Sequence, residues 1–195
     1  MLDPEKNKSR RQKHDQKRYG VSLVYLPDTE TLASIRAWLN KLDVLCGGAF
    51  MWYPVLHLSL VRCKSILEQF EVKDTALLCC GSVKREKTRS IKADIGSDGV
   101  LRLPFSGITL EGITEVDRFY SGNGLRYDLI TDPWMSLGFI DIERENAAKA
   151  VISLAAYLAE GQFPCFEMTI HELSAVYYHD ILLKTHTLIK KIYLH

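Results

Sequence analysis

The strongest chemical signal in the sequence is a histidine and a serine two positions apart, His57 and Ser59. Residues 55–63 are predicted to form a strand, in which these two side chains share one face while Leu58 and Leu60 face the core. A neutral imidazole can take a proton from an attacking hydroxyl, and a serine hydroxyl can donate a hydrogen bond to a phosphoryl oxygen. The pair therefore suits phosphodiester chemistry, although His-x-Ser alone is a weak motif.

A second strand, predicted over residues 134–142, has a similar pattern in which Trp134 precedes Ser136 by the same spacing. Indole has an N–H that can donate a hydrogen bond, but it has no basic nitrogen and cannot carry a proton near neutral pH. Trp134, or Tyr127 a little upstream, could instead stack on a base of a nucleic acid. From the sequence alone, the alternative that Trp134 is a core tryptophan stays open.

The remaining histidines and the cysteines add no further site. His171 and Ser174 would face opposite sides of a strand, and the other histidines are expected at the surface or in the N-terminal arm. An odd number of cysteines in mostly apolar surroundings favours reduced core thiols, and no spacing resembles a zinc ligand set. We therefore expect neither a metal nor a cofactor. The cysteines are Cys46, Cys63, Cys79, Cys80 and Cys165.

Charge is nearly balanced overall but clustered at one end. The formal net charge is +1, so any attraction to polyanions has to come from local clusters. Seven lysines and arginines crowd residues 1–18, which show no apolar periodicity. We expect a disordered basic arm there, which contacts phosphates, serves as a nuclear import address or solubilises the terminus. No apolar stretch approaches the roughly 20 residues of a membrane span, so we expect a soluble intracellular protein that binds no membrane.

Helices and short strands mix without strict alternation, which predicts an α+β fold rather than a doubly wound parallel sheet. Helices are expected at residues 29–45, with Thr29 as the cap, and at residues 110–120 and 143–160. The turn at residues 96–99 predicts a hairpin. Strands are expected at residues 19–26, 55–63, 75–83, 91–95, 101–103, 134–142 and 166–178, with a helix or turn over 64–72 and a last segment over 181–194.

Several short stretches, in a fixed order, resemble one known family. Residues 55–62 resemble the first motif strand of the 2H phosphoesterases, and specifically of the U6 snRNA phosphodiesterase branch. Residues 86–91 look like the strand of that branch that begins "EKTR", and residues 115–118 look like its following helix. Residues 132–139 resemble the second motif strand, where the family has Asp-Pro and then His-x-Ser. The resemblance spans roughly residues 19–178.

The resemblance implies a two-lobed α+β fold with antiparallel sheets, lobes related by a pseudo-twofold axis and a central groove, here residues 19–195 as a single domain. It also implies metal-independent 3′–5′ trimming of oligoU or oligoA tails of U6 snRNA, leaving a 2′,3′-cyclic phosphate or its opened form. In the family one histidine is the base, the other is the acid and both serines hold the phosphate, so His57, Ser59 and Ser136 carry over. An RNA 3′ end as partner, proteins of an RNP and a nuclear location follow from the same resemblance.

The chain departs from the family at two places. The second motif histidine is replaced by Trp134, and the family's Gly-Asn-Lys near the last strand is replaced by Tyr178-His179-Asp180. Because one general acid or base contributes about 10²–10⁴-fold to a rate, losing one proton carrier should weaken turnover strongly. Three alternatives follow: an enzyme with weakened activity, an inactive relative that binds RNA 3′ ends within an RNP, and a protein-interaction domain with no RNA role.

Overall fold

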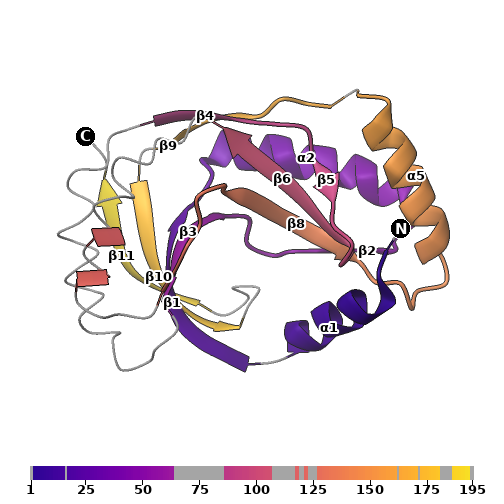
Figure 1. The fold of residues 1–195 in the computed structure, drawn as a ribbon. Coiled ribbons are helices and arrows are strands. Elements are labelled where there is room, and N and C mark those ends of the chain that lie inside the picture. The colour runs from indigo at the N-terminus through magenta and orange to yellow at the C-terminus, as the bar shows by residue number, and fades with distance from the viewer. Residues whose placement is uncertain are drawn as a thin grey trace.

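The computed structural model describes residues 2–15, 17–63, 86–106, 117–118, 121–122, 127–161, 163–170, 172–180 and 186–193. Figure 1 shows α1, α2 and α5 around a strongly curved set of strands. The helices are α1 (Pro4–Asp15), α2 (Thr29–Leu45) and α5 (Ala147–Ala159). The strands are β1 (Lys17–Tyr25), β2 (Phe50–Trp52), β3 (Leu58–Cys63), β4 (Glu86–Ser90), β5 (Asp94–Ile95), β6 (Val100–Ser106), β7 (Tyr127–Leu129), β8 (Trp134–Ile140), β9 (Glu167–Ile170), β10 (Glu172–Asp180) and β11 (His186–Tyr193).

The strands pair in the order β11-β10-β1-β3-β8-β6-β4-β9, with β2 on β8, β5 on β6 and β7 on β3. Every one of these pairs is antiparallel. The α+β class with antiparallel sheets is therefore confirmed. The two expected motif strands, β3 and β8, are neighbours near the middle of this order, although seventy residues separate them in the sequence.

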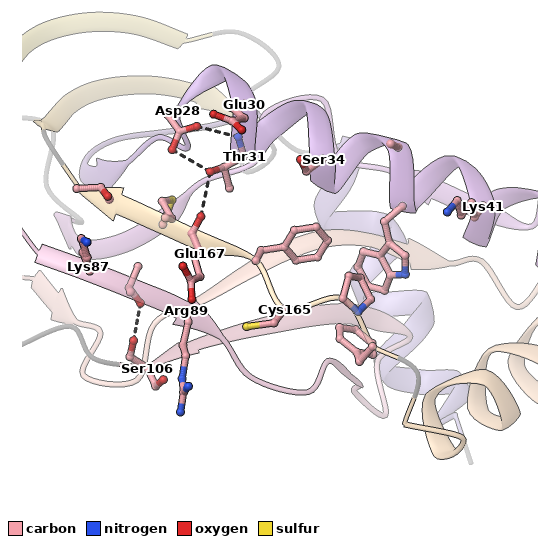
Figure 2. A pocket seen from close by; sticks show the side chains of 18 of the residues that line it. Asp28, Glu30, Thr31, Ser34, Lys41, Lys87, Arg89, Ser106, Cys165 and Glu167 are labelled. Carbon is pink, nitrogen blue, oxygen red and sulfur yellow. Dashed lines mark hydrogen bonds between the residues drawn. The ribbon is translucent and has the colours of Figure 1, made fainter.

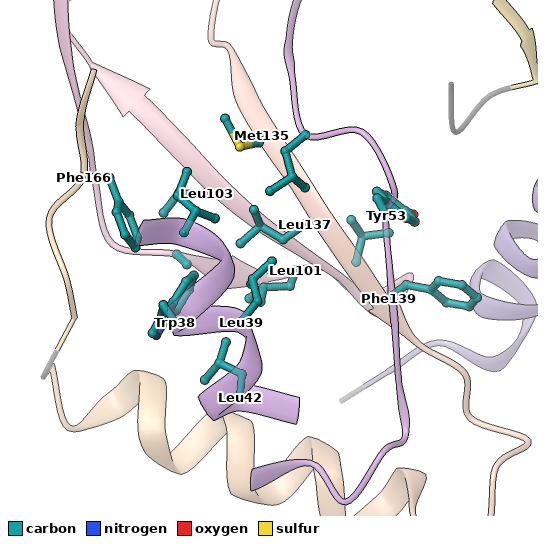
Figure 3. Packing of buried hydrophobic residues seen from close by; sticks show 14 of the residues in the cluster. Trp38, Leu39, Leu42, Tyr53, Leu101, Leu103, Met135, Leu137, Phe139 and Phe166 are labelled. Carbon is teal, nitrogen blue, oxygen red and sulfur yellow. The ribbon is translucent and has the colours of Figure 1, made fainter. Parts of the chain in front are cut away.

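The core lies between α2, α5 and one face of the strands. In α2 the buried side chains recur at helical spacing, and they include Ile35, Trp38 and Leu42. Figure 3 shows Trp38, Leu39 and Leu42 directed towards leucines of β6 and β8, among them Leu101. Burying one such leucine or isoleucine contributes about 1.5–3 kcal/mol. The opposite faces of β3, β6 and β8 are thereby left for the polar motif residues.

Helix α2 begins and ends where local chemistry requires. Asp28, rather than the expected Thr29, is the N-cap, and its carboxylate accepts a hydrogen bond of 2.7 Å from the backbone N–H of Thr31. Burial opposes ionisation of Asp28, but the hydrogen bonds from Thr31 outweigh it and lower the pKa of this carboxyl. The helix stops before Gly47 and Gly48, whose φ values of 57° and 72° suit glycine. The expected bounds, residues 29–45, are confirmed.

The N-terminal segment differs from the expected disordered arm, because residues 4–15 form helix α1. Its anchor is Asn7, a buried side chain whose amide nitrogen donates to the carbonyl oxygens of Asp98 and Ile140 at 3.0 and 2.8 Å. The amide oxygen of Asn7 accepts from the N–H of Ile142 at 3.2 Å. Asp3 caps the helix by accepting from the backbone of the first turn. Because polar contacts hold this helix in place, its sequence has no apolar periodicity from which the helix could be predicted.

Other differences concern short or divided elements. Strands β2 and β7 were not expected, because three residues are too few for a periodic pattern. Helix α5 begins at Ala147 rather than at residue 143, since the preceding residues form a turn. The single strand expected over residues 166–178 is two strands, of which β9 pairs with β4 and β10 pairs with β1. The segments expected over residues 64–72 and 75–83, and most of the helix expected over 110–120, lie outside the described residues.

The hairpin expected around residues 96–99 is confirmed as the pairing of β5 with β6. Gly99 has a φ of 81°, and a Cβ there would lie 2.6 Å from the amide nitrogen of Asn7. The turn thus holds the N-terminal helix as well as the two strands. No helix in the described part of the chain is long and apolar enough to cross a membrane.

Candidate functional site

The two motif strands meet at one cross-strand pair. Leu58 at the start of β3 is the register partner of Met135 in β8, and both side chains are fully buried in the core. Continuing the same antiparallel register by one residue in each direction places His57 opposite Ser136 and Ser59 opposite Trp134. Two stretches far apart in sequence therefore meet as a pair of symmetrically arranged motifs.

Those four side chains lie on the face opposite to Leu58 and Met135. Side chains alternate along a strand, and directly opposed residues of an antiparallel pair point to the same side. Burial follows this alternation at the start of β8, where Trp134 is exposed, Met135 buried and Ser136 half-buried. In β3 Ser59 is buried like its neighbours Leu58 and Leu60. On the shared face each motif's serine lies across from the first residue of the other motif.

His57 precedes β3 and is half-buried. Its ring Nδ1 lies 3.1 Å from the carbonyl oxygen of Val55. A carbonyl oxygen only accepts, so this hydrogen bond assigns the ring proton of the neutral form to Nδ1. The lone pair of the neutral ring then sits on Nε2, as a general base requires.

Ser59 is 6% exposed and lies within the sheet, with Val24 of β1 as its register partner. Its hydroxyl oxygen accepts a long hydrogen bond of 3.5 Å from the guanidinium of Arg62, an exposed residue on the same strand. Arg62 therefore brings positive charge to the serine of the first motif. The sequence analysis did not single out this arginine, although its spacing from Ser59 was available as a signal.

Trp134 is 38% exposed, so it is not a core tryptophan in this structure. The guanidinium carbon of Arg102 lies 5.7 Å from the centroid of the Trp134 ring, within cation–π range. Asp98 holds the same guanidinium through two hydrogen bonds of 2.9 and 3.1 Å. Arg102 is also the register partner of Ser136. It therefore lies on the face that carries His57, Ser59, Trp134 and Ser136, which we call the motif face. Arginine and aspartate together orient the indole.

A hollow of about 350 Å³ adjoins Trp134 on the side of β5 and β6. Asp94, Arg102 and Ser136 form one cross-strand row, and Pro104 and Trp134 form the next. This places four of the eight lining residues, Asp94, Arg102, Pro104 and Trp134, on the motif face. The residues that line it are Ile91, Asp94, Arg102, Pro104, Phe105, Asp132, Pro133 and Trp134.

Tyr127 is not brought together with the other candidate residues. It lies in β7 opposite Cys63, the far end of β3, about 20 Å along the strand from His57 at the usual rise per residue. Its hydroxyl donates a short hydrogen bond to the carboxylate of Asp117, and this bond raises the pKa of the phenol. Stacking of Tyr127 on a base stays a prediction.

A larger groove of about 1530 Å³ lies between α2, β4 and β9, and none of the motif residues lines it. Figure 2 shows its mouth bordered by side chains of both charges, among them Lys87 and Glu167. Thr31 closes one end by donating to a carboxylate oxygen of Asp28 at 2.8 Å and to the backbone of β9 at 3.2 Å. This groove is separate from the motif face, and the candidate site is assigned to the motif face on chemistry rather than on volume.

Within the described residues, no three histidine, cysteine or carboxylate side chains gather in a way that could hold a metal ion. Of the two cysteines whose surroundings are described, Cys46 is buried and Cys165 exposed. Burial raises the pKa of the Cys46 thiol to about 11, as expected of a core cysteine. His171 and the side chains of His179 and His186 lie outside the described part.

The chain is similar in structure to LigT of E. coli. The crystal structure of LigT complexed with phosphate matches with a TM-score of 0.55 at 17% sequence identity, covering 92% of this chain and 99% of LigT. The apo form matches with a TM-score of 0.56 at 15% identity, covering 92% and 99% of the two chains. The complex with 3′-AMP gives 0.55 at 15% identity, covering 91% and 99%. The chain therefore has the fold of E. coli LigT.

In sequence, no protein-family model matches the chain, and no curated protein matches it.

Proposed function

We propose that this chain, which has the fold of E. coli LigT, is a metal-independent RNA phosphodiesterase that acts at RNA 3′ ends with His57 as its proton carrier. The observation that carries this proposal is the pairing of Leu58 with Met135, because it sets two serine-containing motifs against each other on one face. LigT has been crystallised with phosphate and with 3′-AMP. Both ligands contain the phosphoryl group that two converging serine hydroxyls would bind.

In this proposal Nε2 of His57 takes the proton of a ribose 2′-hydroxyl, whose oxygen then attacks the adjacent phosphorus. The bond from phosphorus to the 5′ oxygen of the departing nucleotide breaks, and a 2′,3′-cyclic phosphate remains. Ser59 and Ser136 donate hydrogen bonds to the non-bridging oxygens as charge develops on them. Trp134 has no basic nitrogen, so water has to protonate the departing oxygen, and turnover is correspondingly weak.

The natural substrate in this proposal is U6 snRNA with an oligoU or oligoA tail, processed in the nucleus alongside RNP proteins. Its support is the order of short motifs along the sequence, from residues 55–62 to residues 132–139. The strand at residues 86–91 that resembles the family's "EKTR" strand coincides with β4.

A second candidate function is binding of an RNA 3′ end without cleavage. The exposed Trp134, held against Arg102, favours it, because an aromatic side chain at this position can stack on a base but cannot transfer a proton. The same serines would then hold the terminal phosphate without turnover. The two functions differ in the expected effect of replacing His57. In the first the replacement lowers the rate of RNA cleavage, and in the second it changes only the affinity for RNA.

The test incubates the full chain with RNA that ends in oligoU and with RNA that ends in oligoA, in the presence of EDTA. Slow shortening is expected, with loss of about 10²–10⁴-fold in His57→Gln. Ser136→Ala should also lose activity, whereas Ser34→Ala, an exposed serine on α2, is the matched control and should not.

Binding of the RNA without shortening over hours would establish the second candidate. Neither shortening nor micromolar binding would reject both functions and leave a role in protein interaction.

A further inference from the structure

We propose that the hollow beside Trp134 is a nucleobase subsite that prefers a base with an amino group, namely adenine, cytosine or guanine, over uracil. This inference rests on the proposed function, because the base belongs to the nucleotide whose phosphate lies at Ser59 and Ser136. It adds a binding site and a selectivity that the motif residues themselves do not provide.

The size of the hollow fits one flat base. At about 350 Å³ it lies near the lower end of the usual range for small-molecule pockets, roughly 300–1,000 Å³. Its walls include two prolines and two aromatic rings, among them Pro104 and Trp134, which give flat apolar surfaces. Such walls suit stacking, the interaction that proteins commonly use for unpaired bases.

The position of the hollow fits a nucleotide bound at the serines. Asp94 pairs with Arg102, and Arg102 pairs with Ser136, so three neighbouring strands carry the row. Adjacent strands are about 4.8 Å apart, which puts Asp94 roughly 10 Å from Ser136. A single nucleotide can therefore place its phosphate at the serine and its base in the hollow.

Exposed apolar surface gathers at the same place. Only five large apolar side chains are markedly exposed in the described part of the chain, and two of them, Ile91 at 51% and Trp134 at 38%, line this hollow. They come from different segments, before β5 and at the start of β8. A base that covers both removes apolar surface from water as well as stacking on the indole.

The polar groups at the rim select which base binds. Asp94 and Asp132 are exposed carboxylates, which only accept hydrogen bonds when ionised. Arg102, the cation of the lining, is already bound by Asp98. An additional phosphate is disfavoured by the two carboxylates, whereas an amino group of adenine, cytosine or guanine can donate to them. Uracil offers a single N–H between two carbonyl acceptors, so its fit is poorer.

The experiment titrates the full ¹⁵N-labelled chain with 3′-AMP, 3′-CMP, 3′-GMP, 3′-UMP and inorganic phosphate, and follows the tryptophan indole N–H signals. Trp134→Phe identifies the Trp134 signal among the three tryptophans. The three nucleotides with amino-bearing bases should shift this signal and bind more tightly than 3′-UMP. Phosphate alone should bind without shifting it.

Variants separate the base from the phosphate. Trp134→Ala should weaken 3′-AMP binding about 5- to 150-fold, the range for one lost stacking contact, and leave phosphate binding unchanged. Ile91→Ala should weaken it less, and Ile152→Ala, an exposed isoleucine on α5, is the matched control with no effect. Asp94→Asn combined with Asp132→Asn should abolish the preference over 3′-UMP.

Equal affinity for 3′-AMP and 3′-UMP, or 3′-AMP binding that is insensitive to Trp134→Ala, would overturn the subsite. If phosphate binding in that case still depends on Ser136, the proposed function survives. If the wild-type chain binds none of these ligands, phosphate included, both the subsite and the proposed function are overturned.

Discussion

The two motif strands have the same backbone arrangement and different chemistry. In the β3 motif, His57 is half-buried and its ring is oriented by a backbone carbonyl. In the β8 motif, Trp134 is more exposed and its ring is oriented by the side chain of Arg102. One motif thus has an imidazole, and the other has an indole with a flat apolar surface.

The pairing of the motif strands is thus compatible with different side chains on their polar faces. The contact that fixes it is Leu58 against Met135 on the core side, which neither motif's polar face touches. The side chains of the polar face can therefore differ between the two motifs while the strand pairing persists.

The largest effect is expected from Trp134→His, which would make the two motifs chemically alike. A second imidazole opposite Ser59 would supply the acid that the departing oxygen lacks, and RNA cleavage should rise about 10²–10⁴-fold. The measurement is the rate of shortening of a 5′-labelled RNA in EDTA, with Trp134→Phe as control. No gain in rate, with binding retained, would mean that the second motif is not placed for proton transfer.

Leu58→Ala should break the contact beneath both motifs. Removing a fully buried leucine costs about 2–5 kcal/mol in free energy of unfolding, here at the point where β3 meets β8. Urea denaturation measures it, and Leu45→Ala, an exposed leucine at the end of α2, serves as the control. A loss below 1 kcal/mol would contradict the role of this pair.

Asn7→Ala should destabilise the β8 side selectively, because Asn7 bonds to backbone groups at the end of β8 and at residue 142. Leaving these buried groups unsatisfied costs about 1–3 kcal/mol. Hydrogen exchange should accelerate around Ile140 and less around β3. Equal acceleration in both regions would show that the hydrogen bonds of Asn7 stabilise the whole sheet instead.

Asp28→Ala should weaken α2, which packs beneath β6 and β8, by about 1 kcal/mol through loss of the N-cap. The pKa of Asp28 is lowered in the folded state, so its contribution is fully present above the unfolded value of about 3.9. It is lost as pH falls through the lowered value. Wild type and variant should therefore differ in stability at pH 6 and converge in acid; a constant difference would disprove the ionic cap.

The smallest effect is expected from Asp98→Asn, which weakens the support of Arg102 behind Trp134. Both partners of this ion pair are partly exposed, so the cost in stability should be only about 0.2–1 kcal/mol. The Trp134 indole signal should nevertheless shift and broaden, because its neighbouring guanidinium is less firmly held. An unchanged signal would mean that Arg102 orients the indole without Asp98.

Much of this fold could be predicted from the sequence where the signal is local. Helix α2 was bounded correctly because its apolar spacing and the glycines after it coincide, and the β5–β6 hairpin followed from Gly96 to Gly99. The strand expected over residues 166–178 was wrong as one element, because its alternation continues while its pairing partner changes from β4 to β1. A partner strand distant in sequence leaves no local pattern.

The candidate site shows the same limit. Alternation predicted the shared face of His57 and Ser59, and that of Trp134 and Ser136. It could not predict that Arg102 would join them, because a register shift between Leu101 and Arg102 decides which residue lies beside Ser136. The docking of α1 likewise uses a buried amide, Asn7, whose partners are more than ninety residues away.

The division between β9 and β10 has a consequence for how the chain folds. β1, near the N-terminal end, has β3 on one side and β10 on the other, so its second edge is covered only by residues 172–180. During synthesis β1 would present an open edge until residues 172–180 have left the ribosome. Pairing over such a sequence distance is intrinsically slow. The strand next to His57 is therefore completed among the last, and refolding should show late protection of β1 amides.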